Sequence, residues 1–311
     1  MCFHKEPLQW IRFAMESVLE QTLEDFELIL VCDNPSYEEA LTYIRNIQDR
    51  RIRLMINDTN IGPTKSFNKA ISQAQGEYIA RMDADDICFP ERLEKQTAYL
   101  DSHPEASVCA TDTHTIDKNG KIIRRNRYYG KHDRTLMFIS NTIPHPTVMF
   151  RRCLLDIRTP LYNESYTYSQ DYELWQHLLL KGHVIHTLDE VLLLYRKNAE
   201  QISTAKKDLQ TAFFEKAQMS FIYGWLNDHG IIKHDDGHNT HILLKKASDA
   251  YASNPCRELM HIIYALYLNL GRYDRKYRLR YLADSNLIAF KVKLIFTLRL
   301  LFPRKRGVCH K

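Results

Sequence analysis

Long apolar segments are missing from this sequence. No charge-free apolar run approaches the roughly 20 residues that span a bilayer, and the N-terminus lacks the apolar core of a signal peptide. The seven cysteines are an odd number, stand far apart and form no C-x-x-C pair, which is typical of a reduced protein. These absences predict a cytoplasmic protein that neither spans a membrane nor is exported.

Strong positive charge is also missing. The formal net charge of +5 is modest for 311 residues, and the basic residues are spread out until the C-terminal tail. We therefore expect no nucleic-acid partner. The early part of the chain has no glycine-rich, basic phosphate loop, which disfavours a nucleotidyltransferase.

What is present is a repeated alternation of helical and extended patterns. Helical spacing is expected over residues 8–23, 37–47, 64–74, 91–100 and onward from 171. Short apolar runs typical of strands occupy residues 26–32, 52–56, 78–82, 106–110, 148–150 and 191–195. Strands separated by helices predict an α/β fold with a Rossmann-like, mixed but mostly parallel sheet over residues 1–203, followed by a helical C-terminal region over residues 204–311.

Polar side chains follow three of the expected strands. They are Asp33-Asn34-Pro35, the segment 57–62 and Asp83-Ala84-Asp85-Asp86. Ligands of open α/β sheets bind at the carboxyl ends of the strands, so these segments mark one candidate site.

Asp83 and Asp85 form a D-x-D pair at a strand end, where residues i and i+2 point to the same side. Such a pair suits Mg²⁺ or Mn²⁺, which bind one or two carboxylates together with phosphate oxygens. Asp86 is expected to cap the next segment. A solvated acidic loop is the alternative reading of this motif.

Five ordered blocks resemble those of the inverting family-2 glycosyltransferases with a GT-A fold, of the bacterial surface-polysaccharide type. The resemblance covers roughly residues 1–203, and the 76–86 block is the most specific. The blocks are Ser17-Val18-Leu19-Glu20-Gln21-Thr22, Asp33-Asn34-Pro35, Asn60-Ile61-Gly62, Gly76-Glu77-Tyr78-Ile79-Ala80-Arg81-Met82-Asp83-Ala84-Asp85-Asp86 and Asp171-Tyr172-Glu173-Leu174-Trp175.

The resemblance implies a role for five residues. Asp33 would hold the nucleotide base, and Lys65 would reach the phosphates. Asp83 would face the ribose and the metal-bound waters, while Asp85 would bind Mn²⁺ or Mg²⁺ directly. Asp171 would be the catalytic base, and its place at a helix start would favour the ionised carboxylate.

Each role has a structural alternative. Asp33 could act as a turn former, Lys65 as a solvated helix residue and Asp171 as a helix cap. His145 and Trp175, which could face the acceptor, are expected to be packing residues.

The resemblance implies transfer of a hexose or related sugar from a nucleotide-diphosphate donor, with UDP-sugars favoured. The acceptor would be a saccharide or a lipid-linked saccharide in surface-polysaccharide synthesis. The alternative is an inactive relative that binds nucleotide sugar.

The sequence departs from the family pattern at three places. At the N-terminus, Met1 to His4 correspond to the last residues of a first strand, so we expect a truncated strand and an impaired protein or a start codon assigned too late. Gln170 replaces a usual glutamate, and Asn198 stands where a histidine is common, which puts a third metal contact in doubt.

Two further segments, near the C-terminal end of the chain, contain clustered basic or histidine residues. Residues 287–306 resemble a basic amphipathic helix that could contact the inner face of the membrane, or equally a helix docked on the catalytic domain. His234, His238 and His241 are expected to lie in a solvated loop rather than at a metal site.

Overall fold

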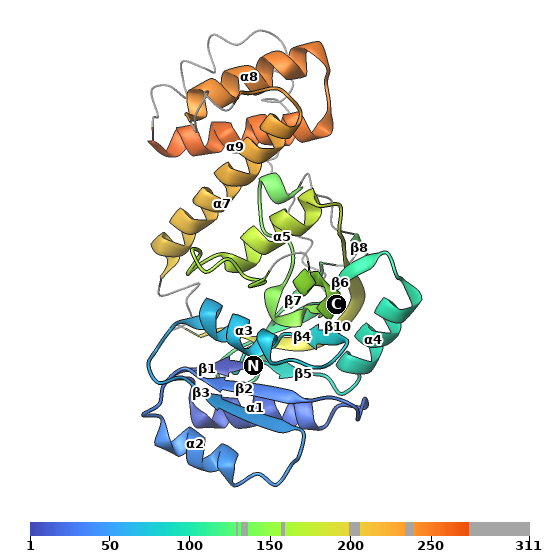
Figure 1. Cartoon of the computed structure of the whole chain (residues 1–311), viewed down its shortest axis with the longest axis vertical. Coiled ribbons are helices and arrows are strands. Elements are labelled where there is room, and N and C mark those ends of the chain that lie inside the picture. The colour runs from blue at the N-terminus through green and yellow to red at the C-terminus, as the bar shows by residue number, and fades with distance from the viewer. Residues whose placement is uncertain (129, 132–135, 157–158, 199–205, 234–238, 274–311) are drawn as a thin grey trace. The chain divides into compact units, whose positions relative to one another are not determined.

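The computed structural model describes residues 1–128, 130–131, 136–156, 159–198, 206–233 and 239–273 (Figure 1). The chain forms two compact units. The first consists of Met1–Arg134 and Asn141–Ala217, and the second of Thr135–Ser140 and Gln218–Lys311. The division falls within one helix, α7 (Lys207–Asp228), whereas the sequence suggested a boundary at residue 203. The tail at 287–306, His234 and His238 lie outside the described residues.

The first unit begins with a small parallel sheet in the order β1-β2-β3. Its elements are β1 (Cys2–Phe3), α1 (Leu8–Leu19), β2 (Leu28–Cys32), α2 (Glu38–Arg45), β3 (Ile52–Ile56) and α3 (Pro63–Ser72). The predicted alternation is confirmed here. Helix α1 buries Ile11 and Met15 against Leu30 of β2 and Leu41 of α2, because apolar residues at helical spacing share one face.

A second, mixed sheet completes the first unit and has the strand order β4-β9-β6-β10-β5. Its elements are β4 (Tyr78–Ala80), β5 (Ile87–Cys88), α4 (Arg92–Ser102), β6 (Ala106–Ile116), β7 (Ile122–Asn126), β8 (Gly130–Lys131), β9 (Met149–Arg151), α5 (Gln170–Leu180) and β10 (Val184–Arg196). Among the described strands of this sheet, only β6 and β10 pair in parallel. The parallel pairing predicted for most of the sheet is found among β1, β2 and β3 and between β6 and β10. The other described pairs of the second sheet are antiparallel, including β7, which returns along β6 through a tight turn.

A cavity of about 770 Å³ lies next to Met1, the residue before the short strand β1. Cys2 of β1 pairs with Val31 of β2 and bridges to Asp83, so β1 joins the two sheets over only two residues. The cavity is lined by Ile29 of β2 and by all of β4, among other residues. The buried amino group of Met1 donates to the carbonyl oxygen of Ile29 at 2.9 Å, and burial lowers the pKa of this amine.

The second unit is helical, as predicted for the C-terminal region. It contains the end of α7, α8 (Thr240–Ser253), α9 (Arg257–Tyr273) and the 3₁₀ turn η1 (Leu136–Phe138). Phe138 packs against Phe221 and Trp225, and Asn239 caps α8 by accepting from two backbone N–H groups. In the part of the chain that is described, no helix has the length and apolar character to cross a membrane.

Candidate active site

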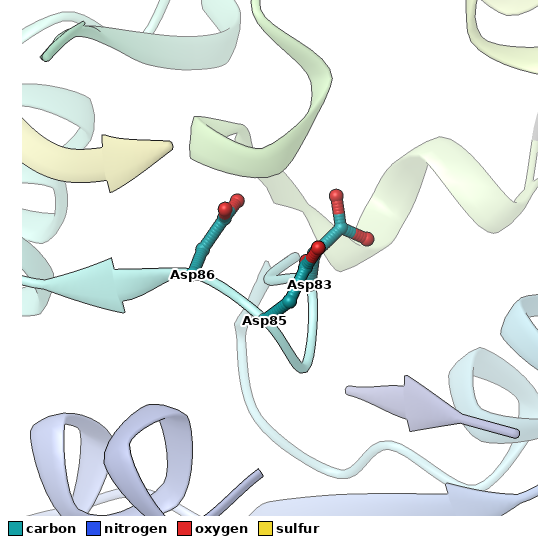
Figure 2. Close-up of side chains that lie close together, drawn as sticks. All are labelled: Asp83, Asp85 and Asp86. Atoms are coloured by element: carbon teal, nitrogen blue, oxygen red, sulfur yellow. The ribbon is translucent and has the colours of Figure 1, made fainter. Parts of the chain in front are cut away.

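Three carboxylates converge at the turn between β4 and β5. Figure 2 shows Asp83, Asp85 and Asp86 leaving this turn, and one ligand atom from each lies within 4.8 Å of the others. Asp85 is 8% exposed and Asp86 is fully buried. Burial raises the pKa of Asp86 well above its ordinary value, and the neighbouring charges of Asp85 and Asp83 raise it further.

This cluster meets the requirements of a hard divalent cation. Its donors are carboxylate oxygens, the ligands that Mg²⁺ and Mn²⁺ prefer. The Oδ2 atom of Asp86 is buried and has no hydrogen-bond partner among the described residues. A bound cation would offset the repulsion among the three carboxylates, so the residues present fit the predicted metal.

Strand β10 fixes the carboxylate turn from the opposite side. The Nε atom of Arg196 donates to the carbonyl oxygen of Asp85 at 2.7 Å, and its backbone N–H donates to Asp86 Oδ1 at 2.8 Å. Asp86 was predicted to cap the next segment. That prediction is wrong, because β5 follows directly and the carboxylate instead ties the turn to β10. Asn198 donates from Nδ2 to Asp85 Oδ2 at 3.3 Å. An amide therefore contacts the cluster at the position where a histidine is common in the family.

Arg81 is a site residue that the sequence reasoning missed. Its guanidinium forms a bidentate ion pair with Asp83, in which Nη1 donates to Oδ2 at 2.8 Å. The guanidinium carbon lies 5.1 Å from the centre of the Phe67 ring, and the side chain is only 11% exposed. The pair holds Asp83 in one orientation and offsets part of the negative charge of the cluster.

Asp33 holds the segment 57–62 in place. Its Oδ1 accepts from Asn57 Nδ2 at 2.8 Å and from the backbone N–H of Ile61 at 2.9 Å, and its Oδ2 accepts from the N–H of Gly62 at 2.9 Å. Gly62 has φ +85°, a conformation that favours glycine. The turn-forming role is therefore present, and the contact between Asp33 and a nucleotide base stays a prediction.

The lysine that joins this network is Lys69, four residues beyond the predicted Lys65. Lys69 donates from Nζ to Asn57 Oδ1 at 2.7 Å, and Asn57 in turn donates to Asp33. Lys65 lies exposed in the first turn of α3. Its contact with phosphate stays a prediction, while Lys69 and Asn57 orient Asp33.

Asp171 is the second residue of α5, at the helix start predicted for it. Its Oδ2 accepts from Asn141 Nδ2 at 2.7 Å, and its carboxylate also accepts from the N–H groups of Tyr172 and Asp171. Burial is the largest influence and raises the pKa of Asp171, although these hydrogen bonds and the charge of Arg81 lower it. The helix start was expected to favour the ionised form, and burial acts in the opposite direction.

The residues beside this carboxylate form an aromatic core. The Nε2 atom of His145 and the hydroxyl of Tyr162 share a hydrogen bond of 2.8 Å, and both rings contact Phe67. Burial, and then the charge of Arg81, holds the pKa of His145 well below its ordinary value. Trp175 is fully buried against His145. The prediction that His145 and Trp175 are packing residues is confirmed.

The fold is similar to that of solved structures of TarS from S. aureus. The chain resembles TarS residues 1–349 of S. aureus, crystallised in complex with UDP-GlcNAc, with a TM-score of 0.58 and 19% identity over 87% of this chain and 80% of that one. The complex of the same TarS fragment with UDP matches with a TM-score of 0.54, at 16% identity over 85% of this chain and 88% of that one. This likeness confirms the predicted α/β fold.

Residues 1–157 match glycosyl transferase family 2. An uncharacterized glycosyltransferase of Methanocaldococcus jannaschii is 34% identical over 201 residues, which cover 63% of this chain and 69% of the relative. The chain therefore belongs to glycosyl transferase family 2 and is a sugar transferase.

Two further relatives are named for polysaccharide synthesis. The amylovoran biosynthesis glycosyltransferase AmsE of Erwinia amylovora is 30% identical over 65% of this chain and 76% of its own length. The O-antigen biosynthesis glycosyltransferase WbnJ of Escherichia coli is 31% identical over 68% of this chain and 82% of its own length. The resemblance to transferases of the surface-polysaccharide type is thus confirmed.

Proposed function

We propose that this protein transfers a sugar, most simply a hexose, from a UDP-sugar to a saccharide or lipid-linked saccharide with inversion at the anomeric carbon. The observation that carries the proposal is the pairing of two acidic sites in the first unit. One is the cluster of Asp83, Asp85 and Asp86, and the other is the partly buried Asp171. The charge of Arg81 acts on Asp83 and on Asp171, which supports a single site.

The donor would bind at the carboxylate turn. Asp85, with Asp83 and Asp86, would hold Mn²⁺ or Mg²⁺, which when bound offsets the charge that develops on a diphosphate leaving group. Asp33 would accept a hydrogen bond from the N–H of a uracil ring, and Lys65 would contact the phosphates. The complexes of TarS with UDP-GlcNAc and UDP support a uridine donor.

Asp171 would act on the acceptor. Its carboxylate takes the proton from the acceptor hydroxyl while the hydroxyl oxygen bonds to the anomeric carbon. The bond from that carbon to the diphosphate oxygen breaks, and the nucleoside diphosphate leaves from the opposite face. Burial suits this role, because a carboxylate with a raised pKa is a stronger base.

The acceptor and the cellular location follow from the relatives and the composition. AmsE and WbnJ support an acceptor in surface-polysaccharide synthesis. We infer a cytoplasmic enzyme with a catalytic domain over residues 1–203. In the helical C-terminal region, residues 204–311, the tail at 287–306 would contact the inner face of the membrane.

The decisive experiment measures release of nucleoside diphosphate from UDP-, GDP- and dTDP-sugars, with Mn²⁺ and candidate saccharide acceptors. Asp85→Ala should abolish metal-dependent donor binding, because it removes the expected direct ligand. Asp171→Asn should retain donor binding and lower turnover by about 10² to 10⁴-fold. Normal turnover by Asp171→Asn would contradict the assignment of the base.

The same assay addresses the inactive alternative. One observation favours it: Asp83 is already paired with Arg81. An inactive relative would bind UDP or a UDP-sugar by calorimetry but release no diphosphate with any acceptor. Metal-dependent and acceptor-dependent release would rule this alternative out.

A further inference from the structure

A short β-hairpin projects from the second sheet and takes no part in the proposed chemistry. It is formed by the end of β6, a turn and β7, and we call its turn and second strand, residues 117–127, the basic hairpin. Its turn is rigid, because Asp117 Oδ1 accepts from the N–H groups of Asn119 at 2.9 Å and Lys121 at 3.0 Å. Gly120 supplies the positive φ of 87° that the turn requires. The hairpin therefore presents its side chains in a fixed arrangement.

Two isoleucines on this hairpin are exposed. Ile122 is 46% exposed and Ile123 is 54% exposed, the largest exposed fraction among the bulky apolar side chains described. Single exposed apolar residues are common and need no explanation, but two neighbours at a hairpin turn form an apolar tip. Successive residues of a strand face opposite sides, so both faces of the tip are apolar.

Positive charge surrounds the apolar tip. Residues 113–131 contain six lysines and arginines against one aspartate, Asp117. Lys118, Lys121, Arg124, Arg125 and Arg127 are all exposed. Within the described part of the chain, the side chains of Arg124, Arg125 and Arg127 form no ion pair. Their charge is thus available to an external partner.

The basic hairpin is also connected to the carboxylate turn. Arg196 donates from Nη1 to the carbonyl oxygens of Asp117 at 3.1 Å and Lys118 at 3.2 Å. The same guanidinium donates from Nε to the carbonyl oxygen of Asp85. One buried side chain therefore fixes both the base of the hairpin and the proposed metal turn. Whatever binds the hairpin is held close to the site.

We propose that the basic hairpin docks this protein on an anionic lipid membrane, with Ile122 and Ile123 entering the interface and the arginines contacting lipid headgroups. An apolar tip with a basic surround matches the chemistry of such a surface, in which apolar burial and attraction to anionic lipid add together. A purely polar anion would leave the isoleucines without a partner. A second copy of the hairpin would bring like charges together, which opposes self-association. The proposal does not depend on the donor or the reaction.

The test is co-sedimentation of the full chain with vesicles of phosphatidylglycerol and phosphatidylcholine in equal parts, and with vesicles of phosphatidylcholine alone. The wild-type chain should bind the anionic vesicles and release them at about 0.5 M NaCl, where surface charges are screened. Arg124→Glu with Arg125→Glu should weaken binding at least about tenfold. Ile122→Ser with Ile123→Ser should also weaken binding to the anionic vesicles at low salt, because it removes the apolar contribution while leaving the charge unchanged.

Matched controls separate the effect of the hairpin from that of net charge and of exposed apolar surface elsewhere. Arg45→Glu with Arg50→Glu makes the same charge change at other exposed positions, and Leu209→Ser removes another exposed apolar side chain. Both controls should bind like the wild type. An unchanged melting temperature shows that the hairpin variants are folded.

An independent measurement uses Ile123→Trp, which places a fluorescent side chain at the apolar tip. Its tryptophan emission should shift to the blue on anionic vesicles and should be quenched by brominated lipid. The proposal is overturned if the wild-type chain does not bind anionic vesicles, or if the hairpin variants bind as well as the controls. It is also overturned if the hairpin variants change the oligomeric state in solution, which would identify a second copy as the partner.

Discussion

Replacing Asn141 by alanine tests whether Asp171 is the base. Asn141 donates to Asp171 Oδ2 at 2.7 Å, and this hydrogen bond favours the ionised carboxylate against the effect of burial. Asn141→Ala removes the donor without placing a new charge nearby. The pKa of Asp171 should therefore rise further, and the carboxylate should be ionised only at higher pH.

The size of the effect follows from the hydrogen bond. A hydrogen bond to a charged group contributes about 1.5–3 kcal/mol, which corresponds to a change of about 10- to 150-fold in an equilibrium constant. Because the base acts as the carboxylate, kcat/KM falls as the pH drops through the pKa of Asp171. In Asn141→Ala the acidic limb of this profile should move to higher pH, while the rate on the alkaline plateau stays near that of the wild type.

The assay is nucleoside diphosphate release measured between about pH 5 and pH 9, the range in which a catalytic base titrates. The control is the same substitution in an Asp171→Asn background, where Asn141→Ala should have no further effect because the titrating group is gone. An equal loss of rate at every pH would show that Asn141 supports the fold or the acceptor rather than the ionisation of Asp171. An unmoved acidic limb would refute the assignment of the base.

Other predictions concern stability, donor binding and thiol reactivity. Asp171→Asn should raise the melting temperature at neutral pH. Because the pKa of Asp171 is higher in the folded than in the unfolded chain, the wild-type protein is fully stable below the unfolded pKa and loses stability as the pH rises and the carboxyl ionises. The difference in melting temperature between Asp171→Asn and the wild type should therefore vanish in acid. Lys69→Met should weaken donor binding about 2- to 10-fold, because it removes the hydrogen bond that orients Asn57 beside Asp33. Calorimetry measures the affinity, and an unchanged value would contradict this role of Lys69. A maleimide at neutral pH should label the exposed Cys153 but not Cys109, which is buried with its pKa raised to about 12; peptide mass spectrometry with and without denaturant distinguishes them.

The elements of the first unit could be predicted because their signals are local. The helices at α1 and α2 and the strands at β2 and β3 follow from apolar spacing within a few residues. The direction of pairing in the second sheet could not be predicted this way. Whether a strand runs parallel or antiparallel to its neighbour depends on the connection and on distant partners, as for β6 with both β7 and β10.

The candidate site was only partly predictable for the same reason. Asp83 and Asp85 are two residues apart, so their convergence could be inferred from strand geometry. Arg81 lies equally close in sequence, yet it was missed because an arginine at the end of an expected strand gives no indication that it will be buried against a carboxylate. The basic hairpin could not be predicted either, since the exposure of Ile122 and Ile123 cannot be read from their spacing.

The sequence alone determined the family, the succession of helices and strands, and the acidic residues available for chemistry. Each of these follows from residues that lie within a few positions of one another. The tertiary structure decided which of those residues meet. Asn141 reaches Asp171 across 30 positions, Asp33 holds a loop that begins 24 positions later, and Arg196 joins Asp85 to the hairpin across 111. Such contacts form when the chain packs, since burial and hydrogen bonding act between neighbours in space rather than in sequence.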